Sequence, residues 1–70
     1  MSLKKAILRS FDPGNYLATV EISGSGKAYL EGITVARSLA SDEMITGRKL
    51  AVIFFDEHNP KDAVVVAVYN

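Results

Sequence analysis

The chain has 70 residues, with eight basic and eight acidic side chains, a formal net charge of zero, no cysteine and one histidine. This length fits one domain, residues 1–70, and no stretch approaches the roughly 20 consecutive apolar residues of a membrane helix. Disulfides are excluded and metal ligands are scarce, so oligomerisation is the remaining way to support so small a core. The balanced, scattered charges argue against binding of a polyanion such as nucleic acid.

The beginning of the chain predicts a β-hairpin. A first strand over residues 3–11 leads into a turn at residues 12–15, where Pro13 presets φ and Gly14 and Asn15 tolerate positive φ. The second strand, residues 16–23, alternates more regularly than any other segment. Its inward side chains are expected to be Tyr16, Ala18, Val20 and Ile22.

A Gly-Ser loop tip at residues 23–26 leads to a third strand. This strand is expected to begin at residues 27–31, and its alternation slips at Gly32, which predicts a bulge or bend in a tightly curved sheet. A phosphate-binding role for the Gly-Ser tip would require a helix directly after it. The residues that follow are typical of extended structure instead, so we expect a plain hairpin loop.

Residues 41–47 predict one short helical turn. Ser41 is the expected N-cap, Asp42 and Glu43 suit the positive end of the helix dipole, and Gly47 is the expected stop. Three strands, a short helix and two strands within 70 residues is the order of a small OB-like barrel. The expected fold class is therefore all-β, a five- or six-stranded OB-like barrel with one short helical turn.

The most apolar part of the chain is its end. Residues 49–55 and 63–69 predict two strands, joined by a polar turn at residues 56–62, and both strands are apolar on both faces. A small barrel buries only one face of each strand. The other face needs a cover, which is either another chain segment or another subunit.

Self-association through this closing hairpin is the expected solution, as a homo-oligomer without membrane binding. The sequence leaves open which face of the last strand fills the barrel, because Val64, Val66 and Val68 share one face and Ala63, Val65, Ala67 and Tyr69 share the other. The expected interface residues are drawn from both faces and from the preceding strand: Ile53, Phe55, Val64, Val65, Val66, Val68 and Tyr69.

The polar turn holds His58, the only side chain that titrates near neutrality, among several acidic residues. One histidine without cysteine is too few ligands for zinc, and Pro60 and Lys61 stand where a calcium loop needs other residues. The serines lack the context of an activated nucleophile. We therefore expect a plain turn, no enzymatic activity, no catalytic residue, no cofactor and no metal.

Two alternatives come from other functional classes. OB-type barrels bind oligonucleotides by stacking bases on aromatic side chains over a basic groove. Phe11 and Tyr16 fit the inward pattern, which leaves Tyr29 and Tyr69, with Lys27 and Arg37 nearby. Two tyrosines are few for a base-stacking surface, and the net charge of zero argues against oligonucleotide binding. A barrel that binds a small molecule of unknown identity is the third hypothesis.

The closing hairpin also resembles a known family. Its Gly-led apolar strand at residues 47–56, the turn Asn59-Pro60-Lys61-Asp62, the pair Val64-Val65 and the final Val68-Tyr69-Asn70 resemble the end of the OB-fold domain in phage baseplate hub and tail-spike proteins and in type VI secretion spike proteins. Two positions depart from the family pattern: Val66 stands where a Gly is usual, and Asp62-Ala63 where a Pro precedes Val-Val.

The resemblance implies a structural or assembly role. Copies of the domain would pack around an axis, as a trimer, and contact other phage tail-like proteins. No individual site residue carries over. The resemblance does not extend to membrane puncturing, because the needle-like β-helix of those spikes is not part of these 70 residues. The chain shows no apolar leader, so we expect no signal peptide and a location in the cytoplasm or in an assembled phage-like particle.

Overall fold

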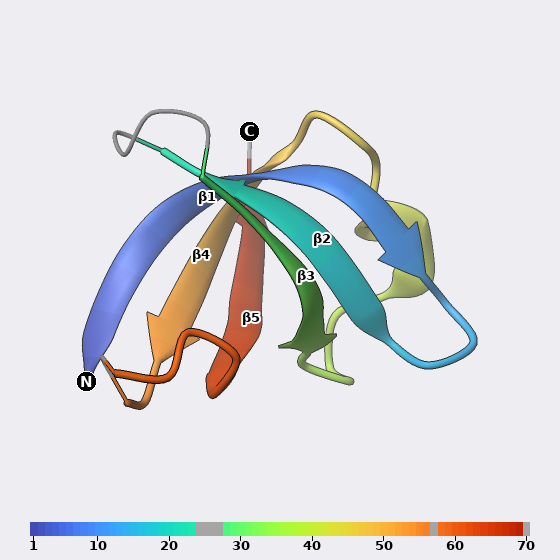
Figure 1. Ribbon diagram of the computed structural model, residues 1–70. Helices are drawn as coiled ribbons and strands as arrows, with labels where there is room; N and C mark the ends of the chain where they lie inside the picture. Colours follow the sequence, from blue (N-terminus) through green and yellow to red (C-terminus); the bar gives the residue numbers. More distant parts are fainter. Residues whose placement is uncertain (24–27, 57, 70) are drawn as a thin grey trace.

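The computed structural model describes residues 1–23, 28–56 and 58–69. Its elements along the chain are β1 (Ser2–Asp12), β2 (Leu17–Ile22), β3 (Ala28–Val35), the 3-10 turn η1 (Ser41–Glu43), β4 (Lys49–Phe54) and β5 (Ala63–Tyr69). The strands form a closed barrel in the order β1-β2-β3-β5-β4 (Figure 1). The all-β prediction with one short helical turn is confirmed, with five strands, while most of the Gly-Ser tip lies outside the described residues.

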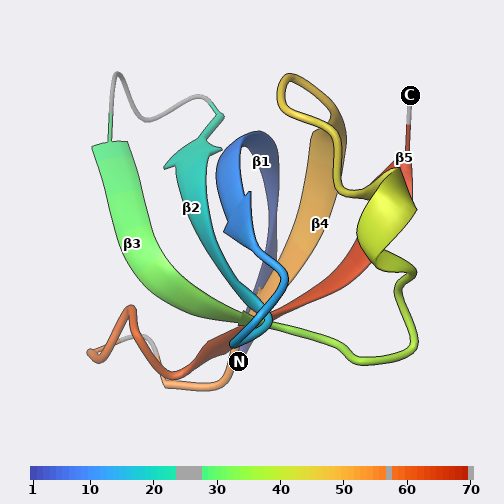
Figure 2. The ribbon, with the colours of Figure 1, turned by 90° about the vertical axis from the view of Figure 1, so that its right-hand side faces the viewer.

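The long first strand joins both halves of the barrel. β1 pairs antiparallel with β2 through its second half and with β4 through its first half, and β4 pairs antiparallel with β5. Figure 2 shows the strands side by side in the order β3, β2, β1, β4, β5. The ring closes where β3 and β5 pair in parallel, at Thr34 with Val64 and Val35 with Val65.

Three extra residues bend the sheet into this barrel. The register shifts at Arg9 in β1, at Glu31–Gly32 in β3 and at Val66 in β5. At each shift this strand has one residue more than its partner strand between two consecutive pairs. Gly32 has φ +71°, a left-handed conformation that glycine adopts without steric cost. The predicted slip at Gly32 is therefore confirmed, and bulges of this kind supply the strong local curvature of a small barrel.

The inward faces of all five strands form one core. Val20, Ile33, Leu50, Val52 and Val65 are among its fully buried members. The remaining buried apolar residues are Ala6, Leu8, Ala18, Ile22, Val35, Met44, Phe54 and Ala63. The inward assignment of the second strand is confirmed, because Ala18, Val20 and Ile22 are buried and Tyr16 packs against them. Within the described ranges there is no helix long and apolar enough to span a membrane.

The first turn differs from the expectation in the residue that takes positive φ. Tyr16 has φ +54°, while neither Gly14 nor Asn15 is left-handed. The Asp12 carboxylate organises the turn instead, because it accepts hydrogen bonds from the Gly14 N–H and from the Asn15 side-chain amide, both at 3.0 Å. Tyr16 is held by its own contacts: its hydroxyl donates to the Leu39 carbonyl and its ring meets Phe11 edge-on at 5.1 Å.

This turn predicts a pH dependence of stability. The hydrogen bonds from Asn15, and then from Gly14, lower the pKa of Asp12 below its ordinary 3.8. A lowered folded-state pKa contributes stability above the unfolded pKa and loses it as the pH falls through the folded value. Asp12→Asn should therefore lower the melting temperature slightly at pH 7, and the difference from the parent should shrink below about pH 4. A gap that stays constant across pH, measured by thermal unfolding, would contradict this.

The helical turn begins one residue earlier than expected and also ends earlier. Ala40, not Ser41, is the N-cap, and it makes no side-chain capping bond, so the predicted Ser41 cap is wrong. The turn ends at Glu43, and Gly47 at φ +96° lies beyond it, where the Gly47 N–H donates to the Leu8 carbonyl at 2.8 Å. Gly47 thus fits a loop that docks on β1, because the segment is too short to continue as a helix.

The connection between β3 and β4 covers one end of the barrel. Met44 is buried in the core and Leu39 packs against it. Arg48 fixes this segment from outside, through an ion pair of 2.6 Å with the Glu43 carboxylate. A loop with two apolar anchors therefore takes the place of a longer helix at this end.

Candidate association surface

The outer faces of β1, β4 and β5 carry aligned apolar side chains. The register places Leu3 beside Ile53 and Ile53 beside Val64, which makes one cross-strand row. Ala51 and Ala67 are partners in the next row. Side chains in directly opposed positions lie about 5 Å apart between their Cβ atoms, so these rows are continuous surfaces.

Several members of this surface are strongly exposed. Leu3 is 65% exposed, Phe55 48% and Val66 38%. Ile53 and Val64 are half-buried between them. We define the apolar band by its outward residues: Leu3, Ala51, Ile53, Phe55, Val64, Val66 and Ala67. Soluble monomers rarely leave a contiguous apolar surface of this kind uncovered, so the band is the leading candidate for a contact.

The bulge in β5 decides which of the expected interface residues lie on this surface. Before the bulge Val65 points inward and is fully buried, and after it Val68 points inward and packs against the core. Val65 and Val68 therefore face the inside of the barrel, and the prediction that they belong to the interface is wrong. A strict alternation would have put Val66 and Val68 on one face, but the extra residue at Val66 turns the strand over.

The other expected residues lie outside. Ile53, Phe55, Val64 and Val66 belong to the apolar band, and Tyr69 is 39% exposed at its end. The sequence analysis did not include Leu3 in the interface, although the alternation of β1 places it on the outer face, away from the inward Ala6 and Leu8. Only the pairing of β1 with β4 shows that Leu3 extends the same surface.

Two lysines border the band near Tyr69. Lys5 is the partner of Ala51, and Lys49 is the partner of both Ile7 and Tyr69. With Ser23 they line a shallow groove of about 240 Å³. The band is thus apolar toward Leu3 and Phe55 and becomes basic toward Tyr69.

The turn of residues 56–62 is organised by its own backbone. The Asp56 carboxylate accepts the His58 N–H at 2.9 Å, and the Asn59 side chain accepts the Lys61 N–H at 3.2 Å. These are the bonds of two successive Asx turns. Among residues 1–23, 28–56 and 58–69, no group of three or more His, Cys, Asp or Glu side chains is placed to hold a metal.

His58→Ala should leave the free energy of unfolding within about 0.5 kcal/mol of the parent. The reason is that His58 is exposed and enters the turn through its backbone N–H, which alanine retains. Chemical denaturation with and without added zinc measures both the stability and any metal effect. A large loss, or zinc stabilisation of the parent that disappears in the variant, would contradict the interpretation as a plain turn.

The two exposed tyrosines, Tyr29 and Tyr69, lie on different strands. Strands β4, β1 and β2 separate Tyr69 on β5 from Tyr29 on β3 along the paired sheet. The row of cross-strand partners that joins them runs through Lys49, Ile7 and Glu21. Tyr29 lies beside the ion pair of Arg9 and Glu21, in which the hydrogen bond and the charge of Glu21 raise the pKa of Arg9. Arg37 stacks over Tyr16, 5.4 Å from its ring centroid, and Lys27 lies outside the described residues.

The fold and this surface define the class: a small closed β-barrel of five strands with an exposed apolar band on three of them. Comparisons with protein-family models, with curated proteins and with solved structures gave no match for the chain.

Proposed function

We propose that this chain is an OB-type barrel that serves as a non-enzymatic structural or assembly module and associates with copies of itself through the apolar band. The observation that carries the proposal is the row Leu3, Ile53 and Val64, flanked by the exposed Phe55 and Val66. A second copy is the cover that best suits the band, because a symmetric oligomer buries the same patch on every subunit. It would also add the apolar burial that a 70-residue core lacks.

Strand order and sequence support the finer parts of the proposal. A five-stranded barrel in which β1 pairs with both β2 and β4, and β3 with β5, is consistent with an OB-type domain. The closing hairpin resembles the OB-fold domain of phage hub and spike proteins, which supports a phage-derived tail or baseplate component and a trimer. Covering the apolar band requires only a closed, symmetric oligomer, whatever its number of copies.

The oligomeric state of the parent protein tests the proposal. We expect light scattering coupled to size-exclusion chromatography to give a multiple of the 7.6 kDa chain mass, constant over a wide concentration range. A constant multiple is expected because an obligate interface of this apolar kind dissociates only at very low concentration. A mass of one chain at the highest concentration would refute self-association.

Oligonucleotide binding is a second candidate because Lys5, Lys49 and Tyr69 line one groove. A single aromatic side chain and two cations suit a nucleotide with a stacked base and a phosphate. Binding of this origin weakens steeply with salt. Retention on single-stranded DNA at low salt that disappears at high salt and in Tyr69→Ala would favour this candidate, and no retention at low salt would remove it.

A further inference from the structure

The inward face of β1 changes character along the strand. Ala6 and Leu8 point into the core and are fully buried. Continuing the same alternation back toward the N-terminus places Ser2 and Lys4 on that inward face. Ser2 is half-buried and Lys4 is exposed, so along this face the strand passes from the core to the rim of a pocket.

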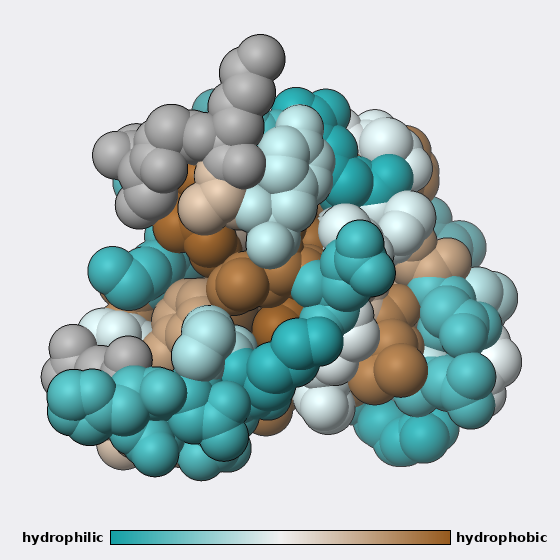
Figure 3. All heavy atoms as spheres, in the orientation of Figure 1, coloured by the Kyte–Doolittle hydropathy of each residue, from teal (hydrophilic) through white to brown (hydrophobic). Residues whose placement is uncertain are grey.

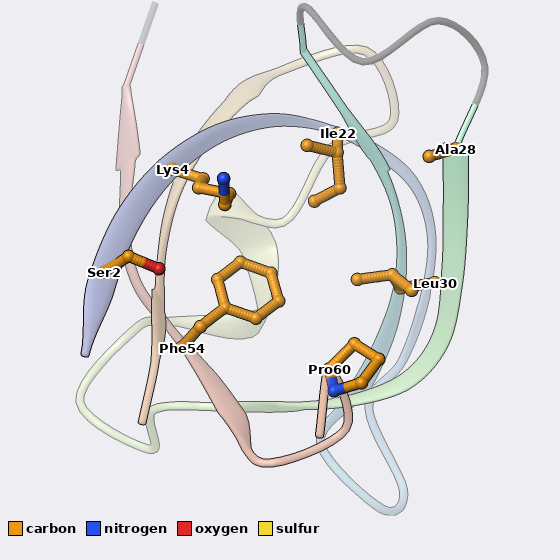
Figure 4. A pocket seen from close by; sticks show the side chains of 7 residues that line it. All are labelled: Ser2, Lys4, Ile22, Ala28, Leu30, Phe54 and Pro60. Atoms are coloured by element: carbon orange, nitrogen blue, oxygen red, sulfur yellow. The ribbon is translucent and has the colours of Figure 1, made fainter. Parts of the chain in front are cut away.

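Lys4 and Ser2 face a pocket that opens through the barrel wall. The pocket has a volume of about 290 Å³ and an apolar lining formed by Ile22, Ala28, Leu30, Phe54 and Pro60. Figure 4 shows the Lys4 ammonium and the Ser2 hydroxyl turned toward the space that these side chains surround. On the face that Figure 1 presents, apolar atoms lie in a central hollow with hydrophilic residues around it (Figure 3).

The topology explains why this pocket is not filled. β3 pairs with β5 only at Thr34 and Val35, so within the described chain the segment from Ala28 to Gly32 has no strand partner on that edge. A bulge at Glu31–Gly32 separates this segment from the part of β3 that pairs with β5. The barrel is therefore tightly packed around Val65 and open around Leu30, which is half-buried at the edge of the core.

The charge of Lys4 is also not matched from within the described chain. The ion pairs formed among residues 1–23, 28–56 and 58–69 join Arg9 to Glu21 and Arg48 to Glu43, and neither of them includes Lys4, which is exposed. Asp12 and Asp56 accept hydrogen bonds within their own turns. An apolar pocket with one cation and one hydroxyl at its rim is complementary to a small apolar molecule that carries a carboxylate.

We propose that this pocket binds a small amphipathic carboxylate, with its apolar body against Phe54, Leu30 and Ile22 and its carboxylate on the Lys4 ammonium and the Ser2 hydroxyl. The volume of about 290 Å³ lies near the lower end of the size range of ligand pockets, which suits a small molecule. The site lies on the inner face of β1 and does not depend on association through the outer apolar band.

Titration with phenylpropionate, phenylpropanol and phenylpropylamine, followed by amide chemical shifts of the labelled protein, tests the site. All three probes share one apolar body and differ in charge. We expect saturable shifts at Leu30, Phe54 and Ala28, with phenylpropionate the tightest, the alcohol weaker and the amine weakest. Equal affinities for acid and alcohol would overturn the carboxylate assignment, and shifts confined to the outer face, or none, would overturn the pocket.

A matched pair of variants separates the pocket from general charge effects. Lys4→Gln should weaken phenylpropionate binding about fivefold, as for loss of one partly exposed ion pair, and leave phenylpropanol binding unchanged. Lys5→Gln, the neighbouring lysine on the outer face, should change neither affinity. Ala28→Leu should fill the space and abolish binding of both probes, with folding checked by the melting temperature. Equal losses in the two lysine variants, or undiminished binding in Ala28→Leu, would refute the proposal.

Discussion

Replacing Val20 with Asp is expected to unfold the domain. Val20 is fully buried, at the centre of β2 and between β1 and β3. The core offers no buried polar or charged partner in the described residues. An unpaired buried carboxylate costs several kcal/mol, against a total stability of roughly 5–10 kcal/mol for a domain of this size. Circular dichroism and chemical denaturation should show no cooperative transition at neutral pH.

Thr19→Asp is the matched control for this experiment. Thr19 is the preceding residue of the same strand and is half-buried on the outer face, so its replacement adds the same charge outside the core. We expect this variant to fold and to melt cooperatively, within about 1 kcal/mol of the parent. A Val20→Asp variant that melts as cooperatively as Thr19→Asp would show that the side chain at position 20 does not face the core.

Lysine at two adjacent positions of β5 is expected to have opposite consequences. Val65→Lys should unfold the barrel, because Val65 is fully buried and its inward side chain contacts the core. Val66→Lys should leave the barrel folded and break the proposed oligomer into single chains, because Val66 is the exposed bulge residue of the apolar band. The lysine would place an unpaired charge in an apolar interface, at a cost of a few kcal/mol for each subunit.

The two variants require two measurements. Far-ultraviolet circular dichroism reports folding, and light scattering reports the mass. Leu3→Lys, on the neighbouring strand β1, should reproduce the effect of Val66→Lys, because Leu3 lies in the same band. If Val66→Lys and Leu3→Lys both keep the mass of the oligomeric parent, copies associate through another surface. If Val66→Lys unfolds, the assignment of the bulge is wrong.

Local patterns in the sequence determined the strands and most of the core. The alternation of residues 16–23 predicted the inward Ala18, Val20 and Ile22, and the slip at Gly32 predicted the bulge. These signals are local, because side-chain direction in a strand and the φ angle of a glycine depend on neighbouring residues. The same pattern showed that β4 and β5 are apolar on both faces.

The tertiary structure decided which of those faces is buried and what lies beside it. The bulge at Val66 cannot be recognised in a run of similar apolar residues, yet it sends Val65 and Val68 inward and leaves Val66 outside. The apolar band and the pocket at Lys4 also combine residues from strands far apart in the sequence, as in the pairing of Leu3 with Ile53. Register between distant strands follows from the packing of the whole barrel, so local sequence alone does not determine these surfaces.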